Sequence, residues 1–343
     1  MKGSVTALAN TAMWFMFAAL MCWGIVSLAG ANVQQVWFAL LQGAFGTQYN
    51  LSNTLVQSIP LLITGLAVIL AFRAQTFNIG VEGQFLVGAI CAVATGGQAI
   101  PSPILLPLTL LSGMVGGAIW ASVPGLLLHF RGIQVVLSSL LLNFVAVQFV
   151  AWVVRGPLQE AVRQYPQSDP ILLNARLPRI LPGLQMHTGL YLALGVAALV
   201  GFVLNRTRIG VQIRAVGNSI DAARTMGLPV GQILLGTLAG SGALAGLAGA
   251  VQICGVTYFL ADPYSKGYGY TAIAVALVAR LNPYAAIPAA LVFGALTSGA
   301  TGVQTAGIPS VVLLVIQAII LLSLLGARFT ARLWPNRWIQ GYK

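Results

Sequence analysis

The feature that most limits the fold of this chain is its series of long apolar segments. Runs of about 18 to 24 residues recur along the sequence, and this is the length that an α-helix needs to cross the hydrocarbon layer of a membrane. Hydrophobic residues make up 58% of the 343 residues and charged residues only 6%, so no soluble core could bury this much apolar surface. The sequence therefore predicts an all-α polytopic membrane protein.

Ten membrane spans are expected, at about residues 9–30, 53–72, 79–97, 104–128, 133–154, 188–205, 230–253, 269–281, 284–300 and 309–326. The first run follows Lys2 as in a signal peptide, but we interpret it as an uncleaved helix because nine further spans follow. The eighth is short, and we expect it to continue a broken element. Residues 31–52, with aromatic side chains among amides, suit a helix that lies in the membrane interface.

The basic residues indicate how the spans are oriented. Cytoplasmic loops of membrane proteins carry an excess of Lys and Arg. With ten spans and both termini inside, twelve basic residues are cytoplasmic and five are outside, four of these in one loop at 155–187. The twelve are Lys2, Arg73, Arg131, Arg206, Arg208, Arg214, Arg224, Arg280, Arg328, Arg332, Arg337 and Lys343. We treat residues 1–343 as a single transmembrane domain.

Several function classes are disfavoured by the same composition. The net charge of +12 does not indicate nucleic-acid binding, because there are only three lysines and no basic run. The cysteines Cys22, Cys91 and Cys254 fall in apolar segments without a CxxC pair, so we expect neither disulfides nor a metal site. His129 and His187 are expected at opposite membrane faces, which argues against an intramembrane enzyme.

The largest inner loop, residues 205–230, predicts a short helix of its own. Asn218 is the expected N-cap, and the negative charge of Asp221 would interact favourably with the positive end of the helix dipole. Gly227 followed by Pro229 would end the helix. A helix of about eight residues is not stable alone, so it must pack against the spans or against a partner protein.

Glu82 is one of only five acidic residues, and it begins an apolar run. One interpretation is structural: its carboxylate complements the dipole of its own helix and pairs with Arg73. The other is functional: a broken segment presents Asn78, Glu82 and Gln84 to a translocation route for a polar solute. The two interpretations are compatible.

Three stretches in order carry a family resemblance: FNIGVEGQ (77–84), RAVGNSIDAARTMGLPV (214–230) and GYGYTAIAVALVARLNP (267–283). Together they resemble permease subunits of ATP-binding-cassette (ABC) importers, in the nucleoside-uptake branch that works with basic-membrane-type lipoproteins and is related to ribose and galactose permeases. The resemblance covers nearly the whole chain. It departs at Gln134-Val135-Val136, where the family usually has Asn-Glu-Val, although Leu142-Asn143 is retained. This departure leaves the choice of substrate open.

The resemblance implies a type II-like importer fold with an inverted repeat of spans 2–5 and 7–10. It implies an ABC ATPase subunit that carries ATP and Mg²⁺, so that this chain binds no cofactor, and an extracytoplasmic binding lipoprotein. It also implies a second permease subunit, with a heterodimer favoured and a homodimer as the alternative. The helix in 205–230 would be the coupling helix that docks on the ATPase, with Arg214, Asn218, Asp221, Arg224 and Gly227 as coupling candidates.

The substrate-pathway candidates are polar residues in or beside the spans: Asn78, Glu82, Gln84, Asn143, Tyr268 and Tyr270. Each has a structural alternative, since buried amides often bond between helices and tyrosines often anchor at the membrane interface. Tyrosine stacking on a nucleobase or sugar is the functional interpretation.

The predicted function is a nucleoside permease subunit in the bacterial cytoplasmic (inner) membrane, with a simple-sugar permease as the alternative. The sequence has no Walker A motif, because none of its lysines follows a glycine-rich turn, so the chain is not expected to hydrolyse ATP. An ion-coupled carrier is a second alternative. That mechanism usually relies on several ionisable groups at membrane depth, and Glu82 is the single acidic candidate.

Overall fold

In the computed structural model, the described part of the chain is built from helices. The structure describes residues 32–305 throughout, and beyond them residues 13–14, 16–17, 19–24, 26–27, 315, 318–319, 322–323 and 326. Within 32–305 the α-helices are α2 (Val33–Phe45), α3 (Gln48–Arg73), α4 (Val81–Gly96), α5 (Leu105–Arg131), α6 (Val135–Arg155), α7 (Gly189–Arg206), α8 (Arg208–Asn218), α9 (Ile220–Thr225), α10 (Val230–Gln252), α11 (Tyr268–Val278) and α12 (Ala286–Thr305). A 3-10 turn, η1 (Leu173–Ala175), and a π-helical turn, η2 (Ile253–Thr257), complete the order.

Eight of the ten expected spans coincide with described helices. The expected span 9–30 is described only in part, and the expected span 309–326 falls largely outside the described residues. Six described helices are long and apolar enough to cross a membrane, namely α3, α5, α6, α7, α12 and α10 continued by η2. The ten-span count, the orientation in the membrane and the inverted repeat stay predictions.

Two apolar helices are too short to cross a membrane. α4 has 16 residues and α11 has 11, which corresponds to lengths of about 24 and 16 Å against a hydrocarbon layer of about 30 Å. The expectation that the eighth apolar segment is short is therefore confirmed, and the helix in the third segment is also shorter than expected. Both helices follow irregular segments, residues 74–80 and 258–267.

The described chain falls into two compact parts, one formed by residues 1–54 with 295–343 and the other by residues 55–294. In the first part, the expected helix within 31–52 is present as α2, which Asn32 caps through a 3.0 Å bond from the Gln34 amide. Thr54 donates its hydroxyl to the Ala44 carbonyl over 2.8 Å. Whether α2 lies in a membrane interface stays a prediction.

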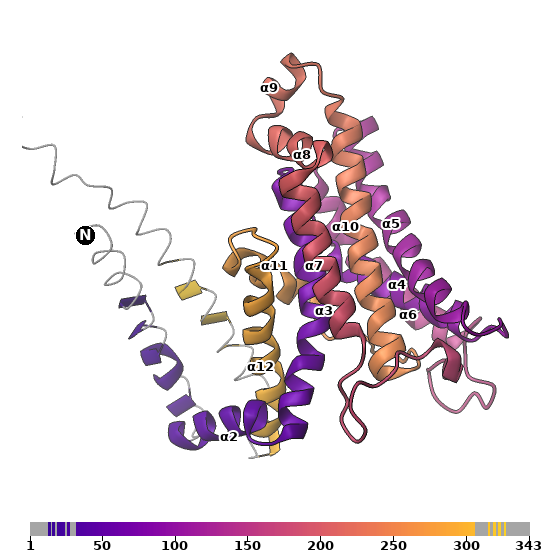
Figure 1. Cartoon of the computed structure of the whole chain (residues 1–343), viewed down its shortest axis with the longest axis vertical. Helices are drawn as coiled ribbons and strands as arrows, with labels where there is room; N and C mark the ends of the chain where they lie inside the picture. Colours follow the sequence, from indigo (N-terminus) through magenta and orange to yellow (C-terminus); the bar gives the residue numbers. More distant parts are fainter. Residues whose placement is uncertain are drawn as a thin grey trace, which may run out of the picture. The chain divides into compact units, whose positions relative to one another are not determined.

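The second part is a bundle whose densest packing joins α4, α5 and α10 (Figure 1). Glycines allow these helices to approach closely. A Cβ placed on Gly246 of α10 would lie 2.1 Å from the Gly113 carbonyl oxygen of α5, and one on Gly88 of α4 would lie 2.3 Å from the Gly246 Cα. Gly242 and Gly246, four residues apart, thus lie where the helix backbones touch, whereas Gly236 has no atom within 4 Å of such a Cβ.

The two ends of this bundle differ in structure. α8 and α9 lie at one end, where α8 packs on α7 and α10 (Figure 1). The long loop between α6 and α7 lies at the opposite end (Figure 1). Arg73, Arg131 and Arg206 end helices α3, α5 and α7.

Candidate functional site

Glu82 lies where the first turn of α4 meets the start of α11. Its side chain is 1% exposed. One carboxylate oxygen accepts a short hydrogen bond from the Ser265 hydroxyl and a 3.2 Å bond from the Gly267 amide. The other accepts a 2.5 Å bond from the Gly269 amide. The N-terminus of α11 has no cap from its own residue Gly267, and Glu82 supplies it instead.

The positive ends of two helices therefore converge on one carboxylate. Glu82 is in the first turn of α4, as expected, but its hydrogen bonds all go to the segment that leads into α11. The expected pairing with Arg73 is wrong: the Arg73 Nε donates to the Leu281 carbonyl over 2.9 Å, at the far end of α11. Glu82 thus caps a helix that lies nearly two hundred residues away in sequence, and Ser265 is a partner that the sequence did not reveal.

Asn143 of α6 caps the start of α4. Its Oδ1 accepts the Gly83 amide at 2.8 Å, and its Nδ2 donates to the Ile79 carbonyl at 2.9 Å. The same Nδ2 lies 3.3 Å from the Tyr270 hydroxyl. Asn143 is 1% exposed, whereas Tyr270 is 44% exposed. The arrangement ties α4, α6 and α11 together at the point where both short helices begin.

Asn78 and Gln84 form a closed amide pair beside this point. Each donates its amide NH₂ to the carbonyl oxygen of the other at 3.0 Å, and Asn78 also donates to Ser241 of α10. Ser241 in turn donates its hydroxyl to the Ala67 carbonyl of α3 at 2.7 Å. Because these buried groups satisfy one another, they stabilise the break between α3 and α4 rather than leaving free donors.

The tyrosines near α11 have different roles. Tyr268 is buried and donates its hydroxyl to Gln57 over 2.6 Å, and its ring packs on Phe85. Tyr264 also stacks on Phe85, with ring centroids 6.2 Å apart. Of the six pathway candidates, five are buried and bonded internally, and Tyr270 alone has an exposed ring.

The helix predicted within residues 205–230 is present in a modified form, and its coupling role stays a prediction. The loop contains two helices, α8 and α9, where one was expected. Asn218 ends α8, and the cap of α9 is Ser219, whose hydroxyl accepts the Ala222 amide at 3.2 Å. Asp221 occupies the first turn of α9 as expected, and Gly227 has a φ of +77° that favours glycine.

A small apolar cluster holds α9 in place. Its buried members are Val216 of α8, Ala223 of α9 and Val230 of α10. Asp221 and Arg224 are exposed and Arg214 is half-buried, so α9 presents its charged side chains to solvent. At Gly217 of α8, an added Cβ would lie 1.9 Å from the Arg73 carbonyl oxygen, so α8 touches α3 directly where the break begins.

A cavity of about 620 Å³ separates α9 from the break between α3 and α4. Its polar lining comes from Gln75 and Thr76 of the break, His129 of α5, Gln134 before α6 and Arg224 of α9. No local sequence pattern predicts this cavity, because its lining comes from four separate stretches of chain.

Comparisons with known proteins show which family the chain resembles. The family described as branched-chain amino acid transport system / permease component matches residues 50–324. The glucose ABC transporter permease protein TsgB13 of Haloferax volcanii is 33% identical over 90% of this chain and 85% of its own length. The guanosine ABC transporter permease protein NupP of Bacillus subtilis is 32% identical over 92% of this chain and 91% of its own length.

A second guanosine ABC transporter permease protein of Bacillus subtilis, NupQ, is 29% identical over 70% of this chain and 78% of its own length. No solved structure matches the chain significantly. The predicted resemblance to ABC-importer permeases is confirmed by the family match and by these relatives. The chain therefore belongs to the family of branched-chain amino acid transport system permease components.

Proposed function

We propose that this protein is the membrane-spanning permease subunit of an ABC importer that takes up a nucleoside delivered by an extracytoplasmic binding protein. The observation that carries the proposal is the likeness to the guanosine permease NupP over 92% of this chain. We place the subunit in a bacterial cytoplasmic membrane, with ten spans and both termini inside. Twelve of the seventeen basic residues lie on the cytoplasmic side in this orientation.

ATP hydrolysis by a separate subunit is coupled to transport through α8 and α9. Two observations support this role: α9 exposes Asp221 and Arg224, and Gly217 of α8 abuts the Arg73 carbonyl at the break. A displacement of α9 by the ATPase would change the cavity between Arg224 and Gln75 and would act on the start of α4. The chain itself binds no ATP or Mg²⁺ in this mechanism.

The translocation route passes the point where α4 and α11 begin. Tyr270 is its contact residue, because an exposed ring with a hydroxyl near Asn143 offers both stacking and hydrogen bonding to a nucleoside. Asn78, Gln84 and Tyr268 support the route by fixing the broken segments. Glu82 holds α11 in the present conformation and becomes available to a solute only if α11 moves.

The shared pattern of α4 and α11 supports an inverted repeat of spans 2–5 and 7–10. Each is a short helix that follows an irregular segment after a long span, α3 or α10, and each has its N-terminus capped by a residue of another helix. The contacts pair the two N-termini at Glu82, as repeats of opposite direction would do at mid-membrane.

A heterodimer of two different permeases forms the pathway. Bacillus subtilis has two guanosine permeases, NupP and NupQ, and this chain resembles NupP more closely. A homodimer is the alternative. To separate the two assemblies, a tagged copy of this chain is co-expressed with a differently tagged copy of itself and with a NupQ-like permease from the same organism. Co-purification of the ATPase with the two different permeases supports the heterodimer, and co-purification with the two copies of this chain supports the homodimer.

The alternative substrate is a simple sugar, because the glucose permease TsgB13 is 33% identical to this chain. The discriminating experiment uses the complete complex in proteoliposomes with its binding protein, and measures ATP hydrolysis with guanosine, uridine, ribose and glucose in turn. Stimulation by a nucleoside and not by a sugar supports the proposal, and the reverse result replaces it with sugar import. Continued uptake after collapse of the proton gradient, with ATP maintained, argues against an ion-coupled carrier.

The role of α9 has its own test. Arg224→Glu reverses an exposed charge, and Arg131→Glu at the exposed end of α5 is a control outside α8 and α9. We expect Arg224→Glu to abolish co-purification of the ATPase while membrane insertion stays normal, and we expect Arg131→Glu to retain most of it. Wild-type uptake by the Arg224→Glu variant would contradict the assignment.

A further inference from the structure

The long loop between α6 and α7 is fastened to the segment that follows α10. Four backbone bonds join them: the Asp262 amide to the Pro166 carbonyl at 3.0 Å, Ser168 to Leu260 at 2.8 Å, Ile171 to Tyr258 at 2.8 Å, and Leu177 to Cys254 at 2.8 Å. The Ser168 hydroxyl returns a bond by accepting the Leu260 amide at 3.0 Å. Residues 166–177 thus form a strap along 254–262.

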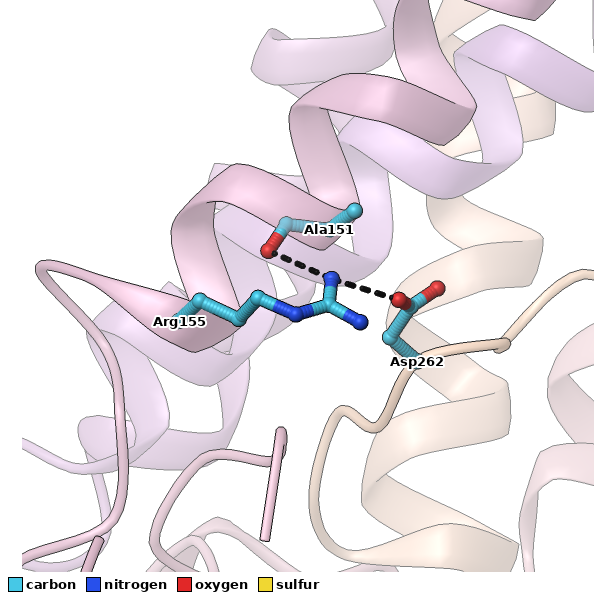
Figure 2. A network of polar contacts seen from close by, with 3 residues as sticks. All are labelled: Ala151, Arg155 and Asp262. Carbon is cyan, nitrogen blue, oxygen red and sulfur yellow. Dashed lines mark hydrogen bonds and ion pairs between the residues drawn. The ribbon is translucent and has the colours of Figure 1, made fainter.

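An ion pair anchors the same segment to α6. The Arg155 Nη1 lies 2.6 Å from the Asp262 Oδ2 and also donates to the Ala151 carbonyl at 3.2 Å (Figure 2). It is the one ion pair found among the described residues. Figure 2 shows the guanidinium held between the last turn of α6 and the loop that bears Asp262, so the pair fixes where that loop lies against α6.

The anchored segment continues directly into the groups that bind Glu82. Ser265 follows Asp262 by three residues and donates its hydroxyl to the Glu82 carboxylate. Gly267 and Gly269 come next and donate their backbone amides to the same carboxylate. Between them, Tyr264 is held by Phe85 and by a 3.3 Å contact between its hydroxyl and that of Thr257. A short stretch therefore connects Asp262 with the start of α11, held through Tyr264 and through the Ser265 bond to Glu82, while Pro263 and Lys266 are exposed.

We propose that Arg155 and Asp262 are positioning residues that transmit docking of the binding protein on the 155–187 loop to the Glu82 contact at the start of α11. They touch no solute. Their ion pair sets the position of residues 262–267, and that position decides whether Ser265, Gly267 and Gly269 reach Glu82. This inference rests on the proposed function for its partner, but the link between the ion pair and α11 concerns this chain alone.

The first test needs only the purified permease. Hydrogen exchange of the amides in 265–270 is measured in wild type, Asp262→Asn, Arg155→Gln and the charge-exchanged double variant Arg155→Asp/Asp262→Arg. We expect exchange to become about two- to fivefold faster in the single variants, the range set by a half-exposed ion pair. We expect the double variant to recover, and Arg163→Gln, a control for an exposed arginine in the same loop, to match wild type. Unchanged exchange in both single variants would overturn the proposal.

The second test uses the whole complex and separates docking from transmission. ATP hydrolysis is measured against the concentration of solute-loaded binding protein. We expect Asp262→Asn to lower the maximal stimulation about two- to fivefold with little change in the half-saturating concentration. A change in the half-saturating concentration alone would mean that Asp262 is a docking residue and would overturn the positioning role.

The two tests also distinguish failure of the inference from failure of the proposed function. If wild type shows no stimulation by any binding protein or solute while the exchange result holds, the proposed function is wrong and the positioning role in this chain stands. If wild type is stimulated but neither single variant differs from it, the proposed function stands and the inference is wrong.

Discussion

Replacement of Glu82 by glutamine tests the capping of α11 most directly. Glutamine keeps the shape of the side chain and one acceptor oxygen, but its NH₂ group then faces a donor of the α11 start. Bonds to a buried carboxylate contribute about 1.5–3 kcal/mol each, and a helix end adds up to about 2 kcal/mol when the charge is partly buried. With at least one of the three bonds lost and the charge removed, we expect a loss of about 2–4 kcal/mol in the free energy of unfolding.

The expected change in melting temperature follows from the chain length. An unfolding entropy of about 2.1 cal/mol/K per residue gives roughly 0.7 kcal/mol/K for a chain of this size, so the midpoint should fall by about 3–6 °C. The assay is thermal unfolding of the purified permease in detergent, followed by monodispersity on a sizing column. Glu160→Gln is the matched control: Glu160 also accepts two backbone amides and a side-chain amide, but in water, so its replacement should lower the midpoint much less.

The outcome separates the two interpretations of Glu82. A lower midpoint with residual transport supports the capping role. A wild-type midpoint together with lost transport would refute the reasoning, because the carboxylate would then act on the solute and contribute nothing to the fold. Ser265→Ala, which removes one donor and leaves the charge, should lie between wild type and Glu82→Gln.

Three further predictions concern other residues of the second compact part, residues 55–294. Ser219→Ala removes the cap of α9, and we expect a loss of about 1 kcal/mol in local helix stability and weaker co-purification of the ATPase, whereas Ser219→Asp should retain both. Gly246→Leu places a side chain where the α5 backbone leaves no room, so the variant should fail to reach the membrane in monodisperse form, while Gly236→Leu, at an open position, should be tolerated. Burial lowers the pKa of His187 to about 4, against about 6.5 in an unfolded chain. The unfolded state therefore binds more protons than the folded state as the pH falls below 6.5, and the free energy of unfolding should decline by about 2 kcal/mol between pH 6.5 and 5. Melting temperatures should show this decline in wild type and not in His187→Gln.

Much of the architecture is readable from the sequence because membrane spans are long and uniform. The expected span 188–205 and the helix α7 (Gly189–Arg206) differ by one residue at each end, since hydrocarbon thickness alone sets the length of an apolar run. The spacing of Gly242 and Gly246 is also typical of close helix contact, because small residues four apart let helix backbones approach.

The sequence revealed less about how the breaks are stabilised. The local pattern around Glu82 suggested a cap for its own helix, because glycines and an acidic residue at a helix start have that meaning locally. Its actual partners are far away in sequence, and a single sequence carries no signal for such pairing. The choice of Ser219 over Asn218 as the cap of α9 is a different case: both residues are good N-caps, and only the end of α8 decides between them.

The cap supplied by Glu82 also has a consequence for the order of synthesis. Glu82 and Gly269 are separated by 187 residues, so at about 5–20 residues per second the carboxylate is synthesised roughly 10–40 s before the amide that binds it. An ionised side chain at membrane depth costs up to about 2.5–3.5 kcal/mol in insertion measurements. If α4 enters the membrane as proposed, it does so before its carboxylate has these partners, and other helices must shield the carboxylate in that interval. We therefore expect a chain truncated before residue 265 to keep the Glu82 carboxylate without the three donors that bind it in the full chain.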